Sequence, residues 1–209
     1  MIPSFKDFYS QQGNSWATKP TIALVPGSFK PPHKGHYDMI EQYANLAYNV
    51  LVLISAPSAR SERKTKDGKV ITPEIAKQIL DIYTKHLTNV TIEISPTPSP
   101  VGAAYTALED ISENPPQETV GVPRVVLGAG KKDNDWRRWS GASDWAKKNG
   151  LNIDIVDPEI TAVEVLEKPD GTPYSASSIR NNFDNPEAVA SDLPDHVDPE
   201  QINKILSSI

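Results

Sequence analysis

The chain has 209 residues, of which 38% are hydrophobic and 23% charged, so it can bury the core of one ordinary domain and is not globally disordered. Its formal net charge of −6 argues against a dedicated nucleic-acid binder, because such proteins carry a basic face that displaces counterions. It contains no cysteine, which excludes disulfides, thiolate chemistry and cysteine zinc sites. The start of the chain lacks the pattern of a signal peptide, and no run approaches about 18 apolar residues, so we expect a cytoplasmic protein without a membrane partner.

Residues 1–19 are polar with interspersed aromatic side chains, and we expect them to form an N-terminal extension. Short apolar runs then predict buried strands at residues 21–25, 50–55, 90–94, 124–127 and 153–156. Helical spacing between these runs predicts helices at residues 34–46, 72–84, 103–111 and 136–148. Strands that alternate with helices are typical of an α/β protein with a doubly wound, Rossmann-like parallel sheet of about five strands.

The pattern changes after residue 157. Residues 162–166 suit another strand, residues 177–182 begin like a helix, and the cap at Asp198 predicts a last helix ending near residue 206. We therefore expect a single domain at residues 20–183 and a C-terminal helical tail at residues 184–209. Doubly wound sheets bind ligands beyond the carboxyl ends of their strands, so the loops that lead from strand to helix are the first candidates for a site.

The loop after the first predicted strand carries two histidines among glycines and basic residues. Gly27 permits a tight turn and close approach of the backbone to a phosphate, and the following helix start offers free amide donors. His33 and His36 are three residues apart, so both imidazoles can face one side and donate hydrogen bonds to a phosphoryl group. Gly35 between them leaves room for a ligand. Packing residues or a chance metal pair are the alternative, but the position between strand and helix favours function.

This segment resembles the Gly-x-Phe-x-Pro-x-His-x-Gly-His signature of the nucleotidylyltransferase superfamily. Every fixed position is matched, by Gly27, Phe29, Pro31, His33, Gly35 and His36. The resemblance implies ATP or CTP as donor and a phosphorylated small molecule as acceptor, for example nicotinamide mononucleotide, phosphopantetheine or a polyol phosphate. It further implies that the histidines stabilise the pentacoordinate transition state and that Mg²⁺ is bound through the substrate phosphates, with no protein metal ligands.

A second segment resembles the Ile-Ser-Ser-Thr-x-Ile-Arg motif of the same superfamily, which grips the β- and γ-phosphates. Its direct matches are Ser175, Ile179 and Arg180, while Ser177 replaces a threonine. Tyr174 and Ala176 depart from the motif, and Ala176 removes one hydroxyl. A plain serine-capped helix is the alternative. The resemblance implies that nucleotide phosphates contact Ser28 and the hydroxyls of this segment, including Ser178, and that Lys34 and Arg180 neutralise phosphate charge.

Weaker features bear on the acceptor. Arg60 and Arg63 follow the second predicted strand and are candidates for an acceptor phosphate, with a solvated charged loop as the alternative. Gly128 begins a glycine-rich turn that lets the nucleotide approach. Mononucleotide adenylyltransferases resemble this region with Gly-x-Asp and a later tryptophan, but Gly130 occupies the aspartate position here. Trp136 is a candidate to stack on a base or pyridine ring, with core packing as the alternative.

Together these features predict transfer of AMP from ATP to an acceptor such as nicotinamide mononucleotide, with release of pyrophosphate. Cytidylyl transfer to a polyol phosphate and a catalytically silent nucleotide-binding protein of the same fold are the alternatives. The intact histidine pair favours the enzyme, because a binding protein needs only the phosphate cradle. The sequence leaves an oligomer open. His86 and His196 have no evident partners in the sequence and are interpreted as structural.

Overall fold

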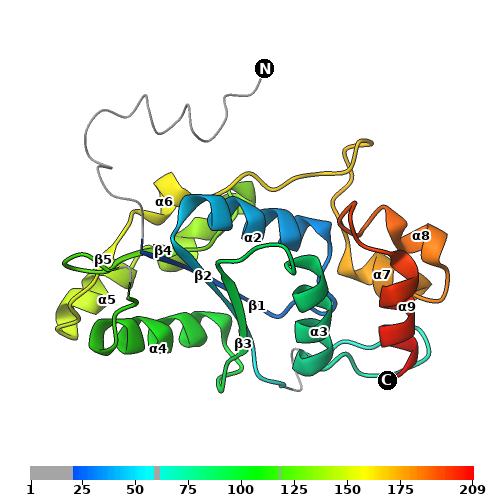
Figure 1. Cartoon of the computed structure of the whole chain (residues 1–209), viewed down its shortest axis with the longest axis horizontal. Coiled ribbons are helices and arrows are strands. Elements are labelled where there is room, and N and C mark those ends of the chain that lie inside the picture. The colour runs from blue at the N-terminus through cyan, green and yellow to red at the C-terminus, as the bar shows by residue number, and fades with distance from the viewer. Residues whose placement is uncertain (1–20, 59–61, 118) are drawn as a thin grey trace.

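The computed structural model describes residues 21–58, 62–117 and 119–209, so the extension predicted at residues 1–19 and Arg60 lie outside the described residues. Its centre is a parallel sheet with the strand order β3-β2-β1-β4-β5 (Figure 1). The strands are β1 Ile22–Gly27, β2 Asn49–Ile54, β3 Val90–Ile94, β4 Arg124–Leu127 and β5 Asp154–Ile155. All five predicted strands are therefore present, the last in shortened form.

Helices cover both faces of this sheet because alternate side chains of its strands enter different hydrophobic clusters. Ala23 and Val25 of β1 pack with residues of α2 and α3, whereas Ile22 and Leu24 pack with residues of α4 and α5. These helices are α2 Lys34–Leu46, α3 Pro73–Tyr83, α4 Pro100–Glu113 and α5 Ala142–Lys148. The arrangement confirms the expected doubly wound α/β fold, whose strands lose water on both sides.

The strand order reverses direction at β1, which has β2 on one side and β4 on the other. Gly128, directly after β4, packs very closely against β1: a Cβ atom there would lie 2.8 Å from the carbonyl oxygen of Leu24. Gly128 therefore has a packing reason to be glycine, since any side chain would push the two strands apart. This reversal point is where an open α/β sheet binds ligands.

Two sequence predictions are wrong. The predicted helix at residues 136–148 is divided into a 3₁₀ helix, η1 (Lys132–Trp139), and α5. The two helices are separated by a turn at Ser140 and Gly141, within the range predicted as one helix. The first part of η1 is itself kinked before this range, because Asp133 and Asn134 have φ angles of 56° and 54°, in the left-handed region. Residues 162–166 are all described but form no strand, and Val163 makes only an isolated parallel bridge to Gly130. The chain before them forms the short helix α6 (Pro158–Thr161), capped by Asp157.

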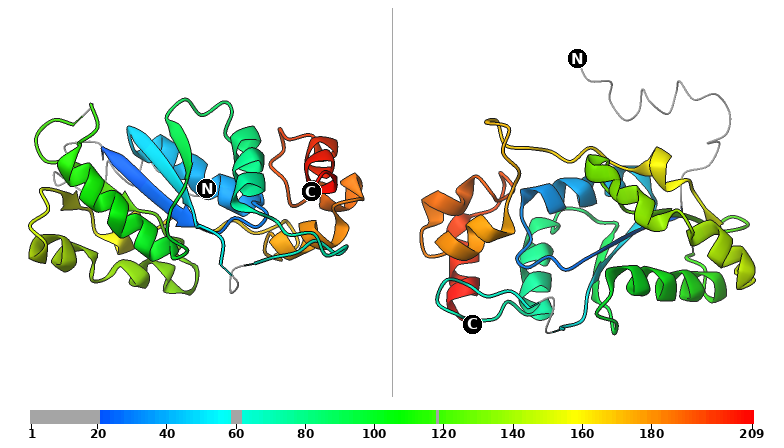
Figure 2. Two further views of the ribbon diagram at one scale, coloured as in Figure 1. Left: turned by 90° about the horizontal axis from the view of Figure 1, so that it is seen from below. Right: turned by 180° about the vertical axis from the view of Figure 1, so that it is seen from behind.

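The C-terminal part of the chain forms three helices that stand together at one end of the molecule (Figures 1 and 2). They are α7 Ala176–Asn182, α8 Pro186–Ala190 and α9 Pro199–Ser207. Val189, Ile202 and Leu206 belong to the same hydrophobic cluster as the inner residues of α2 and α3. The segment predicted as a helical tail therefore contributes to the main core. No helix in the described part of the chain is long and apolar enough to cross a membrane.

Candidate active site

The loop from β1 to α2 is shaped by Phe29. Its φ of 51° folds the ring back over the end of β1, where a Cβ atom on Gly27 would lie 2.8 Å from the ring. The same ring meets the imidazole of His36 edge-on, with 5.1 Å between the ring centroids. Gly27 thus makes room for the Phe29 ring, which in turn supports His36. This contact, and not approach to a phosphate, is the reason for glycine that the structure gives.

His33 and His36 lie face to face at the start of α2, as their spacing predicts. Their ring centroids are 3.7 Å apart and the rings are inclined by 28°. The backbone N–H of His33 donates to Nδ1 of His36 at 3.2 Å. Because Nδ1 of His36 accepts a hydrogen bond, the proton of its neutral imidazole is on Nε2, which becomes a hydrogen-bond donor. The Nδ1 atom of His33 is buried and has no hydrogen-bond partner among the described residues.

Both histidines are neutral at neutral pH. Burial lowers the pKa of His33 to about 4, although the nearby charge of Asp192 opposes this change and that of Lys168 adds to it. Burial also lowers the pKa of His36 well below its ordinary value, and His33 contributes further. Neutral imidazoles still offer one N–H each, so they can stabilise charge that builds up on a phosphoryl group.

Two cations from different parts of the chain lie around this pair. Lys34 Nζ is 2.6 Å from Asp195, and this hydrogen bond raises the pKa of the lysine. Arg180 donates from Nη1 to the carbonyl oxygen of Lys30 at 2.8 Å and from Nη2 to Ser177 Oγ at 2.6 Å. Lys30 belongs to the histidine loop, so Arg180 joins the two segments that the sequence had singled out separately.

The serines of the second segment surround the start of α7. Ser175 caps this helix, since its Oγ accepts the backbone N–H of Ser178 at 3.2 Å. Ser177 is exposed, and Ser28 and Ser178 are half-buried. The room expected at Gly35 is occupied: a Cβ atom there would lie 3.3 Å from the His33 ring and 3.5 Å from the Tyr174 ring. Gly35 therefore lets these two rings approach the helix and does not leave a vacancy for a ligand.

A pocket of about 410 Å³ lies next to this site, between the histidine loop and the segment that leads from β2 to α3. Its polar lining residues are Lys30, Ser58, Glu62, Thr72 and Glu74. Arg63 is exposed nearby. The pKa values of Lys30 and Arg180 are lowered mainly by the burial of these two side chains, and the positive charge of Arg63 lowers both further. Of the two predicted acceptor arginines, the described one therefore acts electrostatically on the site.

Trp136 and Trp139 line a second pocket of about 410 Å³, beyond β5. Trp136 lines it without any residue of the two phosphate motifs, and it packs against the cluster that contains Trp139. Trp139 is fully buried and donates to the carbonyl oxygen of Gly128 at 3.1 Å, so it is a core residue. A Cβ atom on Gly130 would lie 2.5 Å from Val165. Val165 therefore fills the space that the aspartate of the mononucleotide pattern would need.

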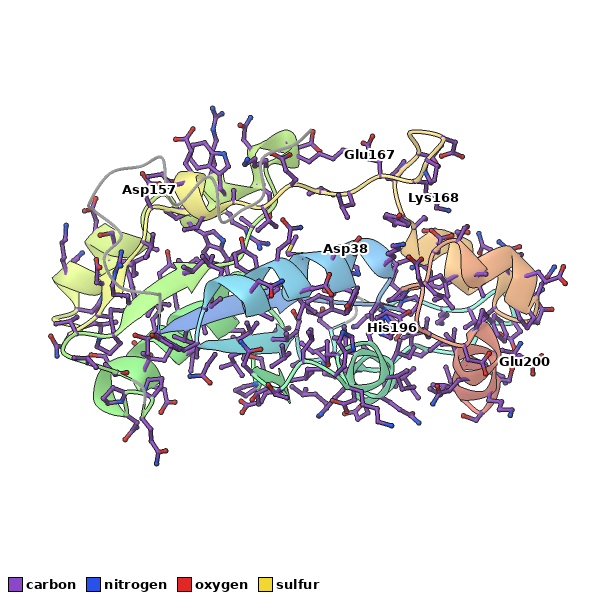
Figure 3. All side chains as sticks on the ribbon, turned by 45° about the horizontal axis from the view of Figure 1, so that its top comes forward. Asp38, Asp157, Glu167, Lys168, His196 and Glu200 are labelled. Atoms are coloured by element: carbon purple, nitrogen blue, oxygen red, sulfur yellow. The ribbon has the colours of Figure 1, made fainter. Side chains whose placement is uncertain are left out.

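Sequence reasoning missed one polar group near the site. Asp192 is fully buried and lies against the start of both α2 and α7, which nothing in its local sequence indicates. His86 and His196, for which the sequence shows no evident partners, both have partners in the fold, in line with their interpretation as structural. His86 Nε2 lies 3.0 Å from the Tyr37 hydroxyl, and His196 Nε2 donates to the carbonyl oxygen of Tyr83 at 2.9 Å. Figure 3 shows His196 beside α2 and α3, where it joins the C-terminal segment to these helices.

Asp38, on α2, supports a prediction about pH. Burial raises its pKa to about 6, and its Oδ2 atom has no partner among the described residues. An unfolded aspartate ionises near pH 4, so the folded state loses stability as pH rises from about 4 through 6. We expect Asp38→Asn to raise the free energy of unfolding by about 1–3 kcal/mol at pH 8 but not at pH 4. Urea unfolding at both pH values measures this, with the exposed Asp81→Asn as control. An equal gain at both pH values would contradict the ionisation of a buried Asp38.

The donor set of the site consists of imidazole N–H groups and the cations Lys34 and Arg180. In the part of the chain that the structure describes, no three His, Cys, Asp or Glu side chains are grouped to hold a metal.

A doubly wound sheet with a histidine pair and an arginine at its reversal point defines an α/β protein built for a phosphorylated ligand. The chain matches the cytidylyltransferase-like family over residues 24–182 and belongs to that family of nucleotidyltransferases. The match begins in β1 and ends in α7, so it contains both segments that build the site.

Relatives within this family match shorter parts of the chain. The phosphopantetheine adenylyltransferase of Micrococcus luteus is 44% identical over 48 residues, which are 23% of this chain and 31% of the relative. That of Heliobacterium modesticaldum is 30% identical over 73 residues, or 35% of this chain and 39% of the relative. The chain thus aligns with about a third of the length of these relatives.

Two solved structures share the fold. A bifunctional NMN adenylyltransferase/ADP ribose pyrophosphatase from Francisella tularensis has a TM-score of 0.54 at 15% identity, covering 90% of this chain and 50% of that one. TmcAL of Thermotoga maritima, bound with alpha-thio ATP, has a TM-score of 0.51 at 16% identity, covering 91% of this chain and 56% of that one. At these identities the likeness concerns the fold alone.

Proposed function

We propose that this protein transfers AMP from ATP to a phosphate-bearing acceptor and releases pyrophosphate. One observation carries the proposal: two neutral, stacked imidazoles lie at the start of α2, and Arg180 of the second motif hydrogen-bonds to Lys30 of the loop that leads to them. A protein that only binds nucleotide needs the arginine and serines but gains nothing from two buried N–H donors. The arrangement therefore supports a reaction in which charge redistributes on a phosphoryl group.

The reaction is an in-line displacement. An oxygen of the acceptor phosphate attacks the α-phosphorus, a new P–O bond forms, and the bond to the β-phosphate oxygen breaks to release pyrophosphate. His36, through Nε2–H, and His33 stabilise the charge on the α-phosphoryl oxygens. Lys34, Arg180, Ser28, Ser175, Ser177 and Ser178 hold the phosphates. Bound Mg²⁺ supplies additional charge neutralisation on the phosphates.

The acceptor is the open part of the proposal. Nicotinamide mononucleotide is our first choice, and the Francisella structure that shares the fold is named for an NMN adenylyltransferase, although at 15% identity this likeness concerns the fold alone. The names of the sequence relatives support phosphopantetheine instead, and the occupied aspartate position at Gly130 weakens the mononucleotide assignment. We propose that the acceptor phosphate binds near Arg63, in the pocket beside Lys30. Trp136 would contact the ring of the acceptor only if that ring reached the pocket beyond β5.

The decisive experiment is an assay of pyrophosphate release with Mg²⁺, in which ATP and CTP are each combined with nicotinamide mononucleotide, phosphopantetheine and polyol phosphates. Release with one pair would identify donor and acceptor together. If no pair released pyrophosphate while calorimetry still detected triphosphate binding, the result would reject the proposed activity and support a catalytically silent nucleotide-binding protein.

Arg180 offers a test of the phosphate cradle. Arg180→Lys keeps the charge but cannot reproduce the fork that reaches both Lys30 and Ser177. We expect the KM for the triphosphate to rise about tenfold, the usual range for losing hydrogen bonds to a charged group. Arg137→Lys, in η1, is the matched control and should leave this KM unchanged. An unchanged KM in Arg180→Lys would remove Arg180 from the nucleotide site.

A further inference from the structure

Asp192 is a buried carboxylate that the proposed reaction does not yet use. Its side chain is fully removed from solvent, which is rare for aspartate unless it is paired. Oδ1 lies 2.9 Å from Lys168 Nζ and accepts the backbone N–H of Ser175 at 2.9 Å. Oδ2 is buried and has no partner among the described residues. Figure 3 shows Lys168 where the chain bends down from Glu167 towards α7.

The backbone of the same residue contacts the other half of the site. The carbonyl oxygen of Asp192 accepts the N–H of Lys34, the first residue of α2, at 2.7 Å. Ser175, which donates to the Asp192 side chain, is the cap of α7. One residue of the C-terminal segment therefore connects the starts of the two helices that carry the histidine pair and the phosphate cradle.

Asp192 and Lys168 also act with opposite sign on one imidazole. The charge of Asp192 raises the pKa of His33, and that of Lys168 lowers it, against the larger effect of burial. His36, stacked on His33, is the other titratable group that faces this ring. The imidazole of His33, whose Nδ1 atom has no partner among the described residues, is therefore affected by both charges of this ion pair. Each of the two charges can be removed by a separate substitution.

We propose that Asp192 is a positioning residue for the histidine pair: it holds the start of α2 against the start of α7 and keeps a buried negative charge beside His33. The role in catalysis rests on the proposed nucleotidyl transfer. A negative charge near His33 favours positive charge on its imidazole, so the ring can carry more positive charge as negative charge collects on the phosphoryl oxygens. Lys168 pairs with Oδ1 of this carboxylate, while Oδ2 has no partner among the described residues.

The test compares two substitutions that break the same ion pair. Asp192→Asn keeps an oxygen for the Ser175 N–H but removes the charge, and Lys168→Met removes the opposite charge with little change in shape. The pKa of His33 is followed by NMR on protein with ¹³C-labelled histidine, with His33→Gln to assign its signal. We expect Asp192→Asn to lower this pKa below its wild-type value and Lys168→Met to raise it. A merely structural pair predicts the same change in both.

Turnover supplies the second measurement. We expect Asp192→Asn to lower kcat about tenfold, the effect of about one pKa unit, with the KM for the triphosphate within about threefold of wild type. Lys168→Met should keep kcat within about threefold of wild type. If a single variant fails to fold, the double variant, which has no unpaired charge, should still show a lowered pKa of His33 because Asp192 acts on it more strongly than Lys168.

Parallel changes in the two variants, or none, would overturn the proposal. So would full kcat in a folded Asp192→Asn protein. The titration needs no substrate, so it distinguishes failure of this proposal from failure of the proposed function. If the wild type were inactive but the pKa of His33 still changed in opposite directions in the two variants, only the proposed function would be refuted.

Discussion

Replacement of His36 by alanine should lower kcat by about 10²–10³ while triphosphate affinity stays within a few-fold. The reason is geometric. His36 accepts the N–H of His33 at Nδ1, so its Nε2–H is directed away from the protein backbone and is available to the phosphoryl group. A donor that acts mainly on transition-state charge contributes little to ground-state binding. Pyrophosphate release gives kcat, and calorimetry gives the affinity for the triphosphate.

The matched control for this experiment is His86→Ala, which removes another imidazole of the chain at a distance in sequence from both phosphate segments. His86 contacts Tyr37 and His196 but neither residue of the histidine pair in the contacts of the described residues. We expect this variant to retain its kcat. Activity of His36→Ala equal to that of wild type would show that the imidazole has no part in the reaction.

Replacement of Leu206 by alanine should lower the free energy of unfolding by about 2–5 kcal/mol, because it leaves a cavity in a packed core. Leu206, on α9, is completely buried in the same cluster as residues of β1, α2 and α3. Gln201→Ala, on the exposed side of α9, should change stability by less than about 0.5 kcal/mol. Urea unfolding of both variants measures the difference. A cost below about 1 kcal/mol for Leu206→Ala would mean that α9 is only loosely attached to the domain.

The sequence predicted most of the fold because its periodic signals are strong. The short β-branched and apolar segments of β3 and β4 and the helical spacing of α2 predicted the observed bounds, and the alternation of strands with helices predicted the parallel sheet. The spacing of His33 and His36 predicted that their rings face one side, since residues three apart are neighbours on a helix.

What the sequence could not give depends on contacts between distant residues. The turn at Ser140 and Gly141 divides a segment whose side chains look helical throughout. The need for glycine at position 27 arises from the Phe29 ring, which only the folded loop places there. Likewise, Asp192 looks like a surface aspartate until packing places it between two helix starts. The sequence predicted that α9 has an apolar side, but not that this side packs into the main hydrophobic core.

The shared core has a consequence for synthesis on the ribosome. The histidine loop and the first three strands emerge early, but the cluster that contains α3 is incomplete until α9, at residues 199–207, has left the exit tunnel. Until then a nascent chain exposes apolar surface, a state in which incomplete domains associate wrongly and attract chaperones. Arg180 and Asp192, to which we assign roles in the site, are also made late. The protein therefore becomes competent for nucleotide only after nearly all of this sequence has been translated, however early its signature motif folds.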